Sequence, residues 1–207
     1  MKQTIIAVIC FLCVSSLYIQ AQKINHPSLL YTPQRIQQVK QRMQHEPKLQ
    51  EAWGDIKKTA DEALQKKDFN RLDYLSLAYL MTDNKEYADA IKEILLKAVE
   101  AESWGDVEMM ARIPAWRSQL GMAHKSFLSA VGYDAAYNVM SSSERKKIAE
   151  GLKRLAVEPA LGDWLLEPTR IHSLNSMGHN WWTSCVCQGG ILALSLQNEL
   201  PEVKEWV

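Results

Sequence analysis

Apolar residues recur at helical spacing along most of the chain. The first such pattern predicts a helix that begins at Pro33, with Thr32 as its N-terminal cap, and ends before Pro47. The same spacing predicts further helices over residues 49–66, 72–81, 86–102, 119–139, 145–156 and 183–196. No alternation of apolar and polar residues closed by Asn-Gly or Asp-Gly indicates a β-hairpin. The sequence therefore predicts an all-α fold built from helical hairpins, such as the pair joined by a turn at residues 82–84.

Two stretches interrupt this helical pattern. Residues 103–117 contain Gly105 and Pro114 together with two tryptophans and two arginines, and we interpret this stretch as a functional loop. Further along, Pro159, Gly162 and Pro168 are predicted to break the chain before the helix at 183–196. Polar loops that lie between apolar helices are the places where binding residues are expected.

Local signals also mark helix ends near the C-terminal half. Ser141 and Glu144 have the spacing of a capping box, which predicts a helix start at this point. Residues 199–207 predict the start of another amphipathic helix, which stops within two turns. Because stacked hairpins bury their faces only against their neighbours, we expect a truncated array, with residues 22–207 forming the N-terminal part of a larger helical domain.

The first 21 residues have the features of a secretory signal peptide. Lys2 precedes an apolar stretch over residues 5–17, and the small residue Ala21 stands before Gln22. This apolar stretch is too short to span a bilayer comfortably, which favours cleavage after Ala21 and argues against a retained membrane anchor. We therefore expect a periplasmic or secreted protein.

Charge and cysteine content narrow the possible partners only a little. The chain has 24 basic and 24 acidic residues, and removal of residues 1–21 takes away only Lys2. No basic run is long enough to suggest a nucleic-acid partner. The mature chain keeps Cys185 and Cys187, whose thiols point in different directions on a helix, and further metal ligands are not evident nearby. We predict two buried free thiols, no metal site and no cofactor.

The richest chemistry lies in residues 175–182, at the entrance of the helix that follows. His179 and Asn180 stand side by side, followed directly by Trp181 and Trp182, and Asn175 lies just before them. An amide can hydrogen-bond a carboxylate or a sugar hydroxyl, an imidazole can move a proton near neutral pH, and indoles can stack on sugar faces. This grouping favours carbohydrate chemistry. The alternative is that Asn180 is a helix cap, His179 a hydrogen-bonded loop residue and the tryptophans core.

Other candidates come from the two loops. Three arginines could hold sulfate or carboxylate groups in a bidentate fork, or could be solvated surface charges: Arg112, Arg117 and Arg170. Trp104 and Trp116 are candidate sugar-stacking walls, and His172 is a candidate contact with substrate. Three further side chains are predicted to have structural or surface positions: Trp53 and Trp164 in the core, and His26 in a cap or on the surface.

A resemblance to a known family adds to this interpretation. The mature N-terminus, His26-Pro-Ser-Leu-Leu-Tyr-Thr-Pro33, and the helix after it resemble the heparinase II/III and alginate lyase group of polysaccharide lyases. The paired helices and the segment Gly178-His-Asn-Trp-Trp182, which looks like the active-site element of that family, extend the resemblance over most of residues 26–198.

The resemblance implies a fold and a reaction. The fold would be an incomplete (α/α) toroid, which in the family is followed by a β-sandwich domain that is absent from this sequence. The activity would be that of a carbon-oxygen lyase that cleaves an anionic, uronic-acid-containing polysaccharide by β-elimination. Asn180 matches the residue that neutralises the uronate, and His179 could be the base, although the family order is usually Asn before His. The family's catalytic Tyr would lie beyond Val207, so residues 22–207 alone are expected to be inactive.

Two other functions remain open from the sequence. One is a glycoside hydrolase on the same kind of toroid, acting on uronyl residues, which would need two carboxylic acids across the scissile bond. Asp163 and Glu167 lie near the loop, but not in a recognisable paired motif. The other is a non-catalytic helical protein that binds glycans. The sequence leaves the exact polysaccharide, endo or exo action and the oligomeric state undetermined.

Overall fold

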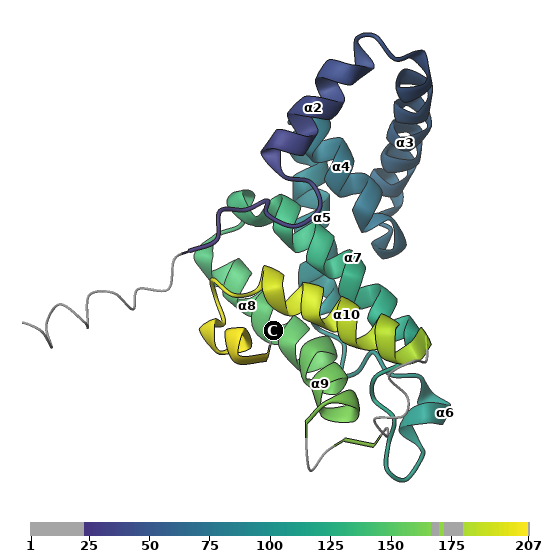
Figure 1. Cartoon of the computed structure of the whole chain (residues 1–207), viewed down its shortest axis with the longest axis vertical. Helices are drawn as coiled ribbons and strands as arrows, with labels where there is room; N and C mark the ends of the chain where they lie inside the picture. The colour runs from purple at the N-terminus through teal and green to yellow at the C-terminus, as the bar shows by residue number, and fades with distance from the viewer. Residues whose placement is uncertain (1–22, 167–169, 172–179, 207) are drawn as a thin grey trace, which may run out of the picture.

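The structure, a computed structural model, describes residues 23–166, 170–171 and 180–206, and this part of the chain is helical without any strand. Figure 1 shows the arrangement of the helices. They are α2 (Pro33–Met43), α3 (Pro47–Lys66), α4 (Leu72–Thr82), α5 (Lys85–Ala98), α6 (Val107–Met110), α7 (Leu120–Ala136), α8 (Ser142–Leu152), α9 (Glu158–Trp164) and α10 (Asn180–Ser195). The all-α prediction is confirmed for these residues.

The predicted local signals set several of the helix ends. The Thr32 side chain accepts a hydrogen bond from the backbone N–H of Arg35, and Pro33 is the first residue of α2. The capping box at the start of α8 forms as predicted, because Ser141 and Glu144 each accept a hydrogen bond from the other's backbone N–H. Each pairing satisfies amide donors that the first turn of a helix leaves without an intrahelical acceptor.

The predicted break at Pro159 and Gly162 is wrong. The chain continues from α8 through a wider π turn, η3 (Lys153–Val157), directly into α9, where Pro159 lies in the first turn. The π turn widens the helix just before Pro159, which accommodates a residue that has no backbone N–H to donate. Likewise, α5 ends at Ala98 rather than at residue 102.

Apolar helices and amphipathic helices pack together in this fold. The helices α4, α7 and α10 are apolar on most sides, whereas α3 and α5 each have one polar face. Helix α7 contacts α4, α5 and α10, and most of its seventeen residues are buried. An apolar helix without a polar face is stable only where neighbours cover it, so α7 lies at the centre of the packing.

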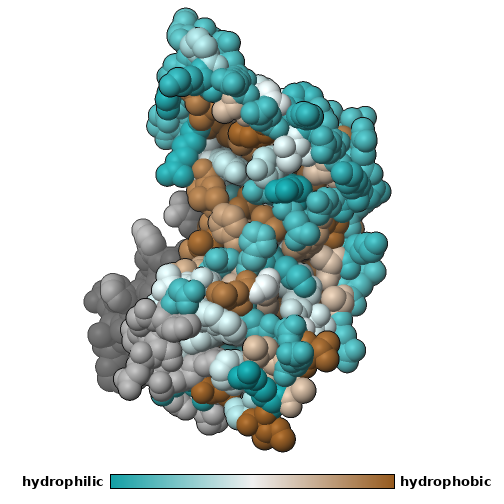
Figure 2. Space-filling view, turned by 90° about the vertical axis from the view of Figure 1, so that its right-hand side faces the viewer, coloured by the Kyte–Doolittle hydropathy of each residue, from teal (hydrophilic) through white to brown (hydrophobic). Residues whose placement is uncertain are grey.

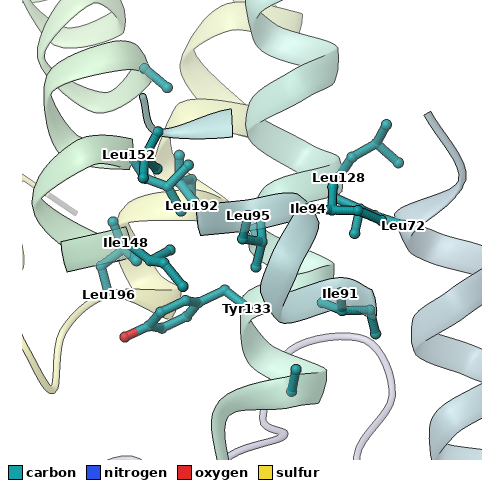
Figure 3. Packing of buried hydrophobic residues seen from close by; sticks show 14 of the residues in the cluster. Leu72, Ile91, Ile94, Leu95, Leu128, Tyr133, Ile148, Leu152, Leu192 and Leu196 are labelled. Carbon is teal, nitrogen blue, oxygen red and sulfur yellow. The ribbon is translucent and has the colours of Figure 1, made fainter. Parts of the chain in front are cut away.

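One large cluster of aliphatic side chains forms the core. Figure 3 shows leucines and isoleucines from α4, α5, α7, α8 and α10 meeting around Leu95. The labelled members are Leu72, Ile91, Ile94, Leu95, Leu128, Tyr133, Ile148, Leu152, Leu192 and Leu196. Burial of each such side chain contributes roughly 1.5–3 kcal/mol, so this cluster holds the helices in their relative positions.

The prediction that residues 199–207 begin another amphipathic α-helix is wrong. Residues 201–206 form a 3₁₀ turn, η5 (Pro201–Trp206), that packs against α10. Leu200 and Val203 are buried in the main core, and Lys153 pairs with Glu202 at 2.9 Å. Both apolar side chains therefore have a place in the core formed by this chain.

The segment before α2 is fastened to α7 by a buried carboxylate. Asp134 accepts hydrogen bonds from the backbone N–H groups of Ser28 and Leu29, and lies 2.6 Å from Nδ1 of His26. The His26 ring also stacks on Tyr137, with 4.0 Å between the ring centroids. The prediction that His26 is a cap or surface residue is wrong, because Asp134 supplies the buried partner that an imidazole needs.

The ends of several helices meet on one side of the molecule. Short connections join α3 to α4 and α4 to α5, so that these neighbours run in opposite directions. The long connection between α5 and α7 therefore lies where α3 and α5 end and where α7 and α10 begin. It carries α6, which Figure 1 places beside the first turn of α10. The predicted functional loop and the predicted helix entrance are thus neighbours.

Candidate functional site

The structure brings together some of the predicted site residues. Asn180, Trp181 and Trp182 form the first turn of α10, and the loop before α7 carries the three predicted contacts Arg112, Trp116 and Arg117. Asn175, His179 and His172 lie outside the described residues. The geometry of the candidate site is therefore that of α10 and of the loop beside it.

The start of α10 presents one polar and two aromatic side chains. Asn180 is the first helical residue and its side chain is exposed. Trp181 and Trp182 are half-buried and pack against a small second core formed by Ala123, Trp164 and Cys185. Because this small core fixes the first turn of α10, the Asn180 amide is held on a rigid element while it stays accessible to a ligand.

An aromatic wall extends from α10 into the loop. The ring centroids of Trp116 and Trp181 lie 6.4 Å apart in an edge-to-face arrangement. The Arg112 guanidinium lies over the Trp116 ring, with its Cζ 4.3 Å from the centroid, and the Arg112 side chain is exposed. A guanidinium stacked on an indole keeps its N–H donors directed sideways, where they can bind carboxylate or sulfate oxygens.

Asp163 is the residue that holds this loop in place. Its side chain is fully buried and accepts hydrogen bonds from the backbone N–H groups of Arg117 and Ser118, at 2.7 and 2.8 Å. The Arg117 guanidinium pairs with the same carboxylate, at 2.8 Å from Nε and 2.6 Å from Nη2. The backbone carbonyl of Asp163 also accepts from the N–H of Ile171. One residue thus joins α9, the loop before α7 and the chain that leads to α10.

Sequence reasoning missed this role of Asp163. The only signal was an acidic residue on the apolar helix that precedes the candidate site, because a buried carboxylate requires hydrogen-bond donors. Since Asp163 is buried and engaged by Arg117, it is not available to contact a sugar as one of the two acids of a hydrolase. Glu167 lies outside the described residues.

The predicted arginines have different surroundings. Arg112 is exposed beside the aromatic wall, whereas Arg117 directs its guanidinium toward the buried Asp163. Arg170 is half-buried and directly precedes Ile171, whose backbone N–H donates a hydrogen bond to the carbonyl of Asp163. Of these three, Arg112 has the position that best suits an anionic ligand, and Arg117 serves to hold the loop.

A hollow lies beside the aromatic wall. It has a volume of about 420 Å³, and we call it the tryptophan hollow. Its lining comes from the loop and from the first turns of α7 and α10: Trp104, Gly105, Asp106, Met109, Gln119, Leu120, Gly121, Lys125 and Trp181. Gln119 is buried and fixes the loop around it, because it accepts from the N–H of Asp106 and donates to the carbonyl of Trp116. This volume falls within the range of small-molecule sites, roughly 300–1,000 Å³.

Apolar side chains are also exposed at this end. Val107, the first residue of α6, is 83% exposed, and Ile113, which follows the end of α6, is 100% exposed. Figure 2 views the molecule from the right-hand side of Figure 1. It shows hydrophobic atoms at the lower end, which is the end that carries α6 in Figure 1. Neither side chain lines the tryptophan hollow.

Two predictions about aromatic and thiol groups need correction. Trp104 is not a stacking wall, because it is 8% exposed and packs edge-to-face against Phe69 in the main core. Cys185 is buried as predicted, and burial raises the pKa of its thiol, but Cys187 is exposed. Two residues along a helix correspond to about half a turn, so the second thiol faces the opposite side. Trp164 is buried and Trp53 packs against the main core, as predicted.

The first turn of α10 and the loop before α7 thus present aromatic faces, one exposed guanidinium and one exposed amide. Among the described residues, no group of His, Cys, Asp and Glu side chains has the geometry of a metal site. None of the helices in that part of the chain has the length and apolar character needed to cross a membrane.

In comparisons with known proteins, the sequence matches no family model and no curated protein at a significant level.

Proposed function

We propose that this chain is the helical part of a polysaccharide lyase that cleaves a uronic-acid-containing polysaccharide by β-elimination. The fold that goes with this proposal is an incomplete (α/α) toroid, in which α4, α7 and α10 are inner helices and α3, α5, α8 and α9 are outer helices. The alternation of apolar and amphipathic helices supports this arrangement.

The observation that carries the proposal is the position of Asn180. Its exposed amide begins α10 directly beside Trp181, which forms an aromatic wall with Trp116 and the stacked Arg112. In this proposal a uronate ring lies against this wall, and the Asn180 amide and the Arg112 guanidinium bind its carboxylate. Recognition of an acidic sugar uses three elements: an aromatic wall, a group that binds an anion and a neutral hydrogen-bond donor.

The chemistry follows from the acidity of the C5 proton. Removal of this proton becomes easier when hydrogen bonds neutralise the adjacent carboxylate, because the negative charge then spreads onto it as an enediolate. The Asn180 amide can donate such a bond without losing a proton itself. In this proposal His179 removes the C5 proton, and a tyrosine or histidine protonates the departing 4-oxygen. The products carry a new carbon-carbon double bond at the non-reducing end.

This double bond gives a direct test. The full-length protein would be incubated with a panel of uronic-acid polysaccharides while the ultraviolet absorbance of the unsaturated uronate is followed. We expect absorbance to rise with at least one of them. A rise in reducing ends without this absorbance would identify a hydrolase, and binding without any cleavage would identify a glycan-binding protein.

A substitution then tests the role of Asn180. We expect Asn180→Ala to lower kcat roughly 10²–10³-fold with little change in KM, because the lost hydrogen bond strengthens in the transition state. Thr183→Ala, which changes another exposed residue in the first turn of α10, is the control and should leave both constants unchanged. A raised KM with unchanged kcat for Asn180→Ala would make Asn180 a residue that only positions the substrate.

A further inference from the structure

A second hollow, larger than the first, lies next to the candidate site. It has a volume of about 780 Å³ and is formed where α3 and α5 end and α7 begins. We call it the lysine hollow, because four of its lining side chains are lysines: Lys66, Lys67, Lys97 and Lys125. Its other lining residues include Phe69, Asn70, Glu93, Ser103 and Trp104.

The charges in this hollow do not cancel. Lys67 forms an ion pair with Glu93, which is the only acidic residue among the described residues of the lining. Within the part of the chain that the structure describes, no ion pair joins the other three lysines to a carboxylate. Three positive charges around one concave surface favour a ligand with several negative groups, because like charges held close together attract counterions strongly.

The two hollows are neighbours on the surface and share two lining residues. Trp104 and Lys125 line both of them, and the Lys125 ammonium lies 5.8 Å from the centroid of the Trp104 ring. The tryptophan hollow begins at Trp181 on α10, and the lysine hollow ends at the last turns of α3 and α5. A linear polymer that contacts Trp181 can therefore continue past Lys125 into the lysine hollow.

We propose that the lysine hollow binds the part of an anionic polysaccharide that extends beyond the candidate site, through carboxylate or sulfate groups on successive sugars. The identity of the polymer as a polysaccharide rests on the proposed function, whereas the preference for a polyanion rests on the lysines alone. Lys66, Lys97 and Lys125 contact the acidic groups, and Asn70 and Ser103 offer hydrogen-bonding groups for sugar hydroxyls.

The surroundings fit an acidic sugar chain better than a single-stranded nucleic acid. Binding of single strands relies on aromatic rings that bases can stack on. The two aromatic rings in this lining pack against each other edge-to-face, and Trp104 is buried. Such rings offer little flat surface to a base, whereas the lysines and the polar side chains remain accessible to a charged sugar.

Matched lysine variants test the proposal. Lys66 and Lys97 lie in the last turns of α3 and α5, and Lys48 and Lys85 are exposed lysines in the first turns of the same two helices. The double variant K66Q/K97Q and the control K48Q/K85Q therefore change the net charge equally, at opposite ends of the same helices. In α3 the two positions are roughly 27 Å apart at 1.5 Å per residue.

The measurement is the binding of alginate and of heparin by the full chain at several salt concentrations, with dextran as a neutral polymer. We expect K66Q/K97Q to weaken binding of at least one acidic polymer roughly tenfold and to reduce its salt dependence, because fewer counterions are released. K48Q/K85Q should bind like the unchanged protein, and dextran should not bind. Equal weakening in both double variants, or in neither, would overturn the proposal.

Two further outcomes separate this proposal from the proposed function. If K66Q/K97Q weakens binding but the protein forms no unsaturated product, the lysine site stands and the lyase activity fails. If product forms with unchanged affinity and KM in K66Q/K97Q, the lyase stands and the lysine site fails. Tighter binding of single-stranded DNA than of either acidic polysaccharide, lost in the same variant, would overturn the proposal in favour of nucleic acid.

Discussion

At the scale of single residues, buried carboxylates decide the geometry of this protein more than the residues with obvious chemistry do. Asp163 holds the loop that carries Arg112 and Trp116, and Asp134 holds the segment before α2. Both carboxylates accept hydrogen bonds from backbone N–H groups of residues that lie outside the helices. A buried charge of this kind is stable only with its full set of donors.

We expect Asp163→Asn to be strongly destabilising. An amide cannot accept all the hydrogen bonds that the carboxylate accepts, and it leaves the Arg117 guanidinium without its counter-charge. Each buried N–H donor left without its acceptor costs roughly 1–3 kcal/mol of unfolding free energy, and the Arg117 guanidinium adds less because its side chain is 38% exposed. Urea unfolding would measure this loss. Arg112→Gln in the same loop is the control and should change stability by less than about 0.5 kcal/mol, because Arg112 is exposed. Equal losses in both variants would contradict this role of Asp163.

At the scale of helices, the close approach of one helix to another, rather than helix propensity, decides which glycines the packing requires. A Cβ atom added at Gly189 would lie 2.8 Å from the Cβ of Ala160 on α9, whereas one added at the next residue, Gly190, would meet nothing within 4 Å. Both glycines lie inside α10. The packing of α10 against α9 therefore depends on Gly189 and not on its neighbour.

This pair of glycines gives a matched test. Replacing a glycine by alanine inside a helix gains roughly 0.5–1 kcal/mol from backbone entropy, and this gain applies to both positions. We expect Gly190→Ala to raise stability by this amount, and Gly189→Ala to lower it by roughly 1–3 kcal/mol because α9 and α10 must separate. Thermal unfolding of the two variants would measure the difference. Similar shifts in Tm would show that the two helices can adjust without cost.

At the scale of the whole molecule, a polar network joins the two ends of the described chain. Glu199, after α10, accepts hydrogen bonds from the hydroxyls of Tyr133 and Tyr137 at 2.6 and 2.8 Å, and Arg145 on α8 donates to the same carboxylate. Asn198 bonds to the backbone of Ile24. The N-terminal segment, α7, α8 and the chain after α10 are therefore stabilised together.

This network predicts a loss of stability at alkaline pH. Burial, and then the hydrogen bond to Glu199, raise the pKa of Tyr133 far above its usual value of 10.0, and burial also raises the pKa of Tyr137. A raised folded-state pKa means that the stabilisation is complete below about pH 10 and is lost as pH rises above it, because only the unfolded tyrosines release their protons there.

Urea unfolding at a series of pH values would follow this loss. We expect the unfolding free energy of the unchanged protein to fall above pH 10, and that of Tyr133→Phe to fall less steeply, although Tyr133→Phe starts lower because it lacks the hydrogen bond to Glu199. Parallel curves for the two proteins would show that Tyr133 does not titrate as this network requires.

The sequence by itself determined the class of the fold and several of the helix boundaries. Periodic apolar residues, Thr32 with Pro33, and the pair Ser141 and Glu144 act within a few residues of themselves, so they can be interpreted without the rest of the molecule. The pairing of Asn180 with two indoles was visible in the same way, because these residues are adjacent in the chain. For such features the local chemistry is sufficient.

Only the tertiary structure decided which distant residues meet. Tens of positions in the chain separate the residues that meet in three places. His26 contacts Asp134, Trp104 packs against Phe69, and Arg117 pairs with Asp163. The linings of the two hollows also combine residues from distant segments. Hydrophobic packing has no fixed sequence separation, and it sets these contacts through the way α7 meets its neighbours. The candidate chemistry was therefore readable from adjacent residues, whereas the surface that surrounds it depends on the packing of the whole chain.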